Sequence, residues 1–269
     1  MNILGVRVDN VDFDGALRKI ESFLADGRQH YIVTPNPEIV VLAQKDEEFK
    51  EILNKADLSI PDGAGIIFAS KFLKGDIKEK VSGVDLMEKL LKNQKSRPEG
   101  ARLAQQSWAA NLKNQNNPSS RMPLIHYGAG ISKIKNNRIF LFGGRNGAAK
   151  RISEKFSNIA GFTENDSEAI KLINESMPDI LFVALGAPKQ EKWIHYNIAK
   201  IPSVKVAIGV GGAFDFISGR IRRAPKFLRK IGLEWLWRFI LQPWRVKRIF
   251  NATIKFPWLI FRSRSRADH

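Results

Sequence analysis

The feature that most constrains the fold is a repeated alternation of short apolar runs with stretches of helical periodicity. The amphipathic stretches include residues 16–24, 37–56 and 81–93. Near-continuous apolar strands separated by helices are typical of a parallel sheet that is covered on both faces. The sequence therefore predicts an α/β fold. The predicted strands are HYIVT (30–34), DLSI (57–60), RIFLF (138–142), ILFVAL (180–185) and KVAIGV (205–210).

Each predicted strand ends in a loop that is rich in glycine or in polar side chains. Because the carboxyl ends of parallel strands lie along one edge of a sheet, we expect the five loops to meet at one crevice. The candidate site residues in these loops are Thr34, Asn36, Asp62, Gly143, Gly144, Gly186, Gln190, Gly211 and Gly212.

Asp62 is the candidate catalytic residue, although turn chemistry alone also explains it. Pro-Asp-Gly (61–63) is a good turn sequence, whereas a carboxylate at the end of a buried strand is well placed to act as a base. The FGGRNG segment (142–147) also has two interpretations: a phosphate-binding loop that opens a helix, or a tight strand-to-helix turn. It is neither a G-x-G-x-x-G fingerprint nor a P-loop, which weakens the alternative of a nucleotide-dependent dehydrogenase.

The positive charge of the chain is concentrated in two segments. Of the net charge of +17, residues 217–269 contribute +12 and residues 93–137 contribute +6, so the remainder is close to neutral. Residues 93–137 are also rich in Asn and Gln and lack apolar periodicity, and we interpret them as an inserted or flexible segment. We therefore divide the chain into an α/β core (1–216) and a basic amphipathic appendage (217–269).

The appendage combines arginines with aromatic side chains. We expect two or three helices, broken at Pro243 and Pro257. Arg238, Arg245 and Arg248 are spaced by seven and three residues and fall on one stripe if helix continues past Pro243. Such a stripe suits the clamping of a diphosphate, and the nearby Trp and Phe side chains suit an anionic bilayer surface.

Metal sites and membrane spans are not indicated by the sequence. There is no cysteine, and the four histidines lack ligand spacing, so no metal site is predicted. Asp12 and Asp14 have the spacing of an Asp-x-Asp metal motif, but they precede an amphipathic helix and we interpret them as helix caps. No signal pattern and no run of 18 apolar residues is present, so we expect a cytoplasmic protein without a spanning helix.

Six sequence blocks together resemble the WecG/TagA/CpsF family of glycosyltransferases, and within it the TagA-type enzymes of wall teichoic acid synthesis. They occur in the family's order and cover nearly all of residues 1–250 except 93–137, where the family usually has a short connection. The blocks are TPNPEIVVLA, ADLSIPDGAGI, VSGVDLMEKL, FLFGGRNG, LFVALGAPKQEKWI and GVGGAFDFISGRIRRAP.

The resemblance implies a fold, a reaction and a set of roles. The fold is a Rossmann-like core with a C-terminal appendage that meets the membrane and helps to complete the active site. The reaction is transfer of N-acetylmannosamine from UDP-ManNAc to undecaprenyl-diphosphate-linked N-acetylglucosamine, forming a β-1,4 bond with inversion. Asp62 matches the family's catalytic base. The other residues that match site positions of the family are Thr34, Asn36, Arg238, Arg245 and Arg248.

An inverting transfer needs one base to deprotonate the acceptor hydroxyl, and Asp62 suits that role. We assign stabilisation of the leaving UDP to the arginines and glycine loops, and expect no metal or other cofactor. The expected partners are a UDP-sugar, a polyprenyl-diphosphate-linked sugar and the anionic inner face of the cell membrane, without nucleic acid; the oligomeric state stays open, a homo-oligomer included. The alternative is a basic peripheral membrane or RNA-binding α/β protein without transferase activity.

Overall fold

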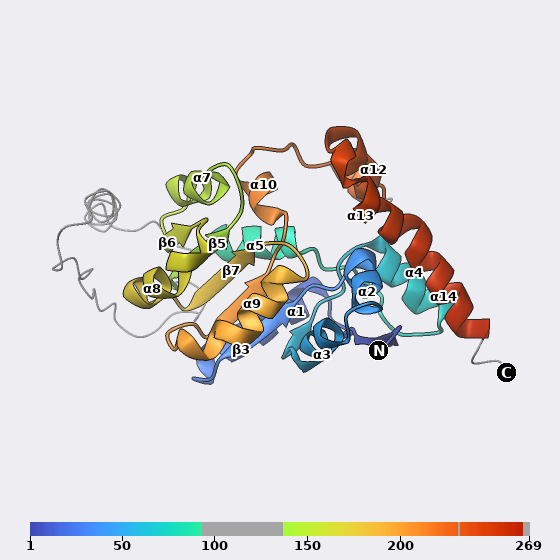
Figure 1. Ribbon diagram of the computed structural model, residues 1–269, viewed down its shortest axis with the longest axis horizontal. Helices are drawn as coiled ribbons and strands as arrows, with labels where there is room; N and C mark the ends of the chain where they lie inside the picture. The colour runs from blue at the N-terminus through green and yellow to red at the C-terminus, as the bar shows by residue number, and fades with distance from the viewer. Residues whose placement is uncertain (93–136, 231, 266–269) are drawn as a thin grey trace.

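A six-stranded parallel sheet forms the centre of the computed structural model, which describes residues 1–92, 137–230 and 232–265 (Figure 1). The strand order is β4-β3-β8-β7-β5-β6. This arrangement confirms the predicted α/β class, whereas nearly all of the segment predicted as an insertion (93–137) lies outside the described residues. The strands are β3 (His30–Val33), β4 (Leu58–Ser59), β5 (Ile139–Gly143), β6 (Ile159–Thr163), β7 (Ile180–Ala184) and β8 (Val206–Gly209).

Strand β6 is missing from the predicted set of strands. It lies at the edge of the sheet and pairs with β5, with a register shift between Ile139 and Phe140. Its sequence, IAGFT, contains Gly161, and glycine within a strand weakens the apolar signal. The five predicted strands are confirmed with small changes of their bounds.

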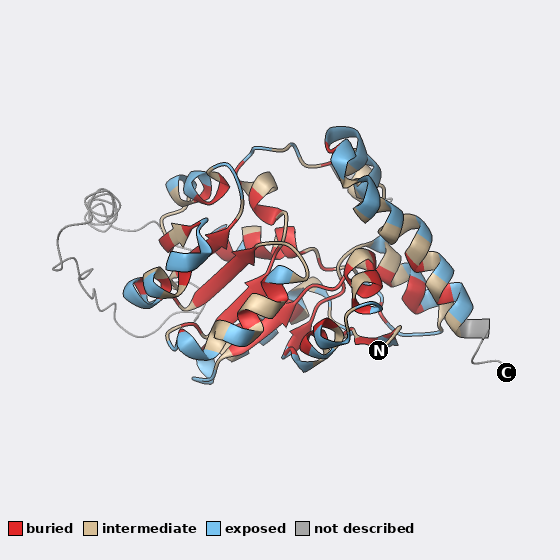
Figure 2. Cartoon of the chain, in the orientation of Figure 1, coloured by how far each residue is buried: buried red, intermediate tan, exposed pale blue. Residues whose placement is uncertain are grey.

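Helices cover both faces of the sheet. Successive strand residues point to opposite sides, so each strand contributes side chains to an apolar cluster on each face. Ile139 and Leu141 pack in one apolar cluster, and Phe140 and Phe142 pack in the other. The strands are accordingly buried (red in Figure 2). The first cluster includes residues of α1 (Phe13–Ala25), α5 (Gly83–Lys92), α7 (Ala148–Lys155) and α10 (Ala213–Ile217). The second includes residues of α2 (Pro37–Ala43), α3 (Glu47–Lys55), α4 (Ala64–Phe72), α8 (Asp166–Ser176) and α9 (Lys189–Asn197).

Two features near the N-terminus complete the core. The strands β1 (Asn2–Ile3) and β2 (Val6–Arg7) form a separate antiparallel hairpin that was not predicted. Asp12 caps α1, since its side chain accepts a hydrogen bond of 2.6 Å from the Gly15 N–H. The interpretation of Asp12 as a helix cap is therefore confirmed.

The appendage is a series of short helices that runs across the core beside α2 and α4 (Figure 1). Phe256 and Ile260 are buried in the same apolar cluster as the residues of α2 and α4. The end of the appendage is therefore part of the core packing. Its elements are α11 (Lys226–Lys230), α12 (Glu234–Leu241), the 3₁₀ turn η2 (Pro243–Arg245), α13 (Val246–Phe250), the π-helical turn η3 (Asn251–Lys255) and α14 (Phe256–Ser265).

The two appendage prolines behave differently. The chain leaves helical geometry at Gln242, with φ −139° and ψ 66°, so the predicted break at Pro243 is confirmed. The predicted break at Pro257 is wrong, because α13, η3 and α14 follow one another without an interruption. In η3 the Phe256 N–H bonds to the Asn251 carbonyl, five residues back. This wider turn gives the proline ring the room that a regular α-helix denies it.

Candidate functional site

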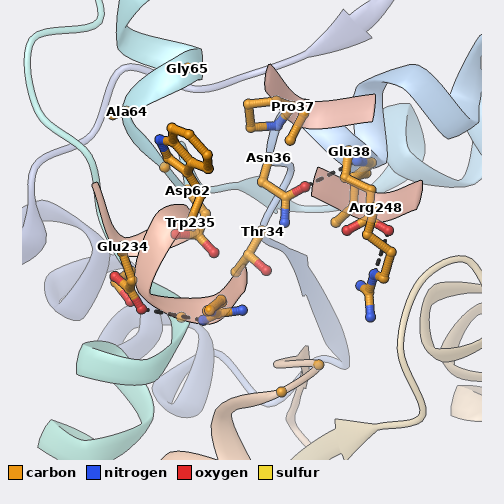
Figure 3. Close-up of a pocket in the computed structure, with 18 of the residues that line it drawn as sticks. Thr34, Asn36, Pro37, Glu38, Asp62, Ala64, Gly65, Glu234, Trp235 and Arg248 are labelled. Atoms are coloured by element: carbon orange, nitrogen blue, oxygen red, sulfur yellow. Dashed lines mark hydrogen bonds and ion pairs between the residues drawn. The ribbon is translucent and has the colours of Figure 1, made fainter. Parts of the chain in front are cut away.

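A pocket of about 570 Å³ opens at the carboxyl edge of the sheet, where the core meets the appendage (Figure 3). Its walls come from the loops that follow β3, β4, β7 and β8, from the start of α5, and from α12 to α14. This volume is within the range of small-molecule sites. Four of the five predicted loops thus meet at one place, and the appendage forms the remaining wall.

Asp62 lies in the turn between β4 and α4 and lines the pocket. Its backbone N–H donates to the Pro35 carbonyl at 3.1 Å, which ties this turn to the loop after β3. Gly63, the N-cap of α4, has φ +94°, a conformation that favours glycine. The Pro-Asp-Gly sequence therefore forms the bend that leads from β4 into α4, and the same segment presents the carboxylate to the pocket.

The surroundings of Asp62 make it a stronger base than an ordinary aspartate. Burial is the main cause that raises its pKa to about 7, and the negative charges of Glu234 and Asp85 raise it further. Arg238 and Lys80 act in the opposite direction. A carboxylate with a pKa near neutral pH is well matched to general-base chemistry.

Thr34 and Asn36 follow β3 and lie on the same wall as Asp62 (Figure 3). The Thr34 hydroxyl donates to the Gly209 carbonyl at 3.1 Å and so joins the ends of β3 and β8. The Asn36 side-chain oxygen accepts the Ile39 N–H at 3.0 Å and caps α2. Both side chains are therefore held in one orientation before any ligand arrives.

Gln190, at the start of α9, fixes two of the loops to each other. Its Oε1 accepts the N–H groups of Gly186 at 3.1 Å and Gly211 at 3.0 Å. Its Nε2 donates to Oε1 of Glu191 at 2.8 Å. Glu191 is fully buried, and burial raises its pKa to about 7. The predicted site residues Gln190, Gly211 and Gly212 line the pocket. Gly186 does not line it and contacts it only through the hydrogen bond to Gln190.

Gly143 and Gly144 do not line the pocket, although both were predicted site residues. Both have φ +87°. A Cβ atom on Gly143 would lie 3.0 Å from the Ala184 backbone, and one on Gly144 would lie 3.0 Å from the Phe214 ring. Close packing of β5 against β7 and α10 accounts for these two glycines in the structure.

The three appendage arginines all line the pocket, although they do not form one helical stripe. Arg238 belongs to α12, Arg245 to η2 and Arg248 to α13, and the helix is interrupted between the first two. Arg238 pairs with Glu234 at 3.3 Å, and Arg248 pairs with Glu38 at 2.5 Å. The fold of the appendage, rather than helical spacing, brings these side chains together.

Arg245 differs from the other two arginines in its environment. Within the described part of the chain it makes no ion pair with a carboxylate within 4.0 Å. Burial is the main cause that lowers its pKa to about 10, and repulsion by Arg248 and Arg238 lowers it further. Arg245 stays positively charged at neutral pH. A Cβ atom on Gly212 would lie 3.6 Å from its Nη2 atom, so the guanidinium lies against the loop after β8.

Three charged residues of the pocket were not among the predicted site residues: Glu38, Lys80 and Glu234. Lys80 precedes α5, and its Nζ donates to the Arg229 carbonyl of the appendage at 2.7 Å. Lys80 lies outside the quoted sequence blocks, whereas Glu38 lies within TPNPEIVVLA, two residues after Asn36. Glu234 had one sequence signal, since it is one of only two acidic residues in 217–269.

Two further expectations concern metals and the membrane. Across residues 1–92 and 137–265, no group of three or more His, Asp or Glu side chains comes together in a way that could hold a metal ion. Over the same described ranges, no helix has both the length and the apolar character needed to cross a membrane.

The pocket therefore combines one basic carboxylate with a cluster of guanidinium groups. The carboxylate can take a proton from a substrate hydroxyl, and the guanidinium groups can hold a phosphate-bearing leaving group. This pairing fits the transfer of a group away from a phosphate ester or diphosphate.

Comparison with known proteins also indicates a group-transfer enzyme. The family model described as "Glycosyl transferase WecG/TagA/CpsF family" matches residues 1–104 and 104–269. Over 250 residues the chain is 30% identical to the N-acetylglucosaminyldiphosphoundecaprenol N-acetyl-beta-D-mannosaminyltransferase of Bacillus subtilis (strain 168), covering 86% of this chain and 82% of that protein.

A second relative, from Staphylococcus aureus (strain MRSA252), carries the same name. It is 28% identical over 266 residues, which cover 94% of this chain and 89% of the relative. The chain belongs to the WecG/TagA/CpsF family of glycosyltransferases.

Proposed function

We propose that this protein transfers N-acetylmannosamine from UDP-ManNAc to undecaprenyl-diphosphate-linked N-acetylglucosamine, with inversion, in synthesis of the wall teichoic acid linkage unit. The names of the two relatives supply the acceptor and the transferred sugar. The observation that carries the proposal is the position of Asp62, a basic carboxylate in a pocket that three arginines of the appendage also line.

Asp62 is the proposed general base. It takes the proton from the 4-hydroxyl of the acceptor sugar while that oxygen attacks the anomeric carbon of the donor. The bond from the anomeric carbon to the diphosphate breaks on the opposite face, and UDP leaves with the bonding electron pair. One base and one displacement invert the anomeric configuration.

The leaving diphosphate is assigned to Arg238, Arg245 and Arg248. Charge-assisted bonds from guanidinium groups are strong, and they gain strength in a site that excludes water. Arg245 is the first choice, because the other two already have carboxylate neighbours. We propose that these cations stabilise the leaving group without a metal. Treatment with EDTA is then expected to leave the transfer rate unchanged.

The appendage is proposed to bind the anionic inner face of the membrane, where a lipid-linked acceptor resides. Much of the appendage is exposed (pale blue in Figure 2). It carries many exposed apolar side chains, including Trp244 with 72% exposure, Trp258 and Phe250. Lys and Arg residues lie among them. Such a surface suits the boundary between headgroups and acyl chains.

The test is a transfer assay with a soluble lipid-diphosphate-GlcNAc analogue as acceptor. UDP-ManNAc and UDP-GlcNAc are compared as donors, because these epimers differ at one stereocentre. The proposal predicts product with UDP-ManNAc and little with UDP-GlcNAc, and the Asp62→Asn variant serves as the inactive control. Equal use of both donors, or of neither, would contradict it. The alternative of a binding protein without transferase activity is not favoured, since the relatives are named as transferases.

A further inference from the structure

Glu234 is an exception in the charge pattern of the appendage. Residues 217–269 carry 14 Lys and Arg, and Glu234 and Asp268 are their only acidic residues. A carboxylate needed only for solubility would be expected on the outer surface of the appendage. Glu234 instead lines the pocket that contains Asp62 (Figure 3).

The packing of α12 brings Glu234 close to the turn that carries Asp62. Gly232, just before α12, has φ +78°, and a Cβ atom on it would lie 2.9 Å from the Ala64 Cβ. Ala64 is the first residue of α4, two positions after Asp62. The start of α12, with Glu234 as its first residue, therefore lies directly against the Asp62 turn.

Contacts on both sides hold Glu234 and α12 in this place. The Trp237 indole N–H donates to the Arg222 carbonyl at 3.0 Å, which fixes α12 to the preceding segment. The Glu234 carboxylate lies 3.3 Å from the Arg238 guanidinium, one turn further along the helix. Arg238 in turn lies 4.7 Å above the Phe216 ring of α10. Glu234 is thus a fixed charge rather than a mobile surface side chain.

We propose that Glu234 is a positioning residue of the transfer reaction. Its negative charge is held near Asp62 where the chain entering α12 packs against the start of α4, and it strengthens Asp62 as the proton acceptor. The inference rests on the proposed function. It also links chemistry to the appendage, because α12 carries both Glu234, which raises the pKa of Asp62, and Arg238, which lowers it.

The other charged groups around Asp62 set the direction of the effect. Lys80, before α5, and Arg238, on α12, both favour the ionised carboxylate of Asp62, whereas Asp85 on α5 disfavours it. Asp85 itself forms an ion pair with Arg223, whose Nη2 donates a hydrogen bond of 2.8 Å to Asp85 Oδ2. Loss of the Glu234 charge would leave the positive charges of Arg238 and Lys80 opposed by Asp85 alone among these groups. The base would then ionise at a lower pH and become weaker.

The experiment compares the pH dependence of kcat/KM for the UDP-sugar in the wild type, Glu234→Gln and Glu234→Asp. Glu234→Gln is expected to move the acid limb down by about 0.5–1 pH unit, which is the size of effect produced by a unit charge several ångströms away. Its rate on the alkaline plateau is expected to fall, because a weaker base accepts the proton less readily. Glu234→Asp, which keeps the charge, is expected to retain the wild-type limb. Glu154→Gln, on the exposed side of α7, removes the same charge far from the pocket and serves as the control.

An acid limb in Glu234→Gln that coincides with the wild-type limb would overturn the inference, even if the rate fell, because loss of packing alone lowers the rate without moving the limb. A limb shifted equally in Glu234→Asp would overturn it as well. Absence of transfer by the wild-type protein would instead refute the proposed function. The two failures are therefore distinguishable.

Discussion

Asp62 shows how one residue meets a structural and a chemical requirement at once. Its backbone N–H closes a contact with Pro35, and Gly63 supplies the left-handed conformation that starts α4. Neither requirement involves the carboxylate, which is left to face the pocket. The turn and base interpretations of Pro-Asp-Gly are thus compatible, and the raised pKa of Asp62 favours a chemical role.

The variant Asp62→Asn tests that role directly. It keeps the size of the side chain and removes its basicity, so the transfer rate is expected to fall by roughly 10²–10⁴. UDP binding, measured by calorimetry, is expected to stay nearly unchanged. The wild-type rate should fall as the pH drops through about 7, because protonation then inactivates the base. Turnover near the wild-type level in the variant would exclude Asp62 as the base.

Arg245 carries the second prediction at this scale. Arg245→Ala is expected to lower kcat/KM for the donor by about 10- to 150-fold, which corresponds to the 1.5–3 kcal/mol of a charge-assisted hydrogen bond. The matched control is Arg222→Ala, which removes an exposed arginine outside the pocket lining. If replacement of Arg238, Arg245 and Arg248 together left turnover of a soluble acceptor unchanged, the arginines would serve the membrane surface only.

At the scale of elements, the sequence predicts the site better than it predicts the edges of the fold. Buried strands produce continuous apolar runs, and the loops after them carry Asp62, Asn36 and Gln190, so their convergence follows from parallel topology. Strand β6 was missed because Gly161 interrupts a short edge strand. The pocket contact of Lys80 depends on tertiary packing, which leaves no local pattern, whereas Glu38 could have been found from its place two residues after Asn36.

The structure of the appendage also depends on tertiary packing that the sequence does not reveal. A proline normally ends a helix, yet the chain passes Pro257 through a π-helical turn that only the three-dimensional packing reveals. The sequence also could not tell which apolar side chains of the appendage face the core. Phe256 is fully buried against the core, whereas Phe250, six residues earlier, is half exposed.

This difference between two phenylalanines gives a prediction for the appendage. Phe256→Ala is expected to destabilise the protein by about 3–5 kcal/mol or to release α14 from the core, because it leaves a cavity among packed side chains. Phe250→Ala is the matched control and should change stability little. Hydrogen exchange of residues 246–265, with chemical denaturation, measures both effects. Equal protection in the two variants would show that α14 does not depend on this contact.

At the scale of the whole molecule, charge and apolar exposure are separated from the core. Residues 217–269 hold +12 of the net +17 and most of the exposed large apolar side chains of the described chain. The same segment forms one wall of the pocket. Membrane binding and assembly of the site are therefore expected to be linked.

Vesicle flotation tests this link. The full chain is expected to bind anionic vesicles with an affinity that falls, but does not vanish, as the salt concentration rises. The attraction of Lys and Arg to the lipid headgroups contributes about 1 kcal/mol per residue and is screened by salt. The burial of Trp and Phe in the membrane is not screened. Trp244→Ala should weaken the salt-insensitive part. Truncation after Ile217 should abolish flotation and reduce transfer. It should also lower stability, since it uncovers the apolar surface under Phe256 and Ile260. Full activity of the truncated chain on a lipid-linked acceptor would refute the link.

The proposed reaction is a single displacement at the anomeric carbon with Asp62 as the base. The most direct measurement is the anomeric configuration of the product, determined by NMR after reaction of UDP-ManNAc with a lipid-diphosphate-GlcNAc analogue. We expect a β-1,4-linked product from the wild-type protein and almost none from Asp62→Asn in the same time. A product with retained configuration, or a β-linked product formed as quickly by Asp62→Asn, would contradict it.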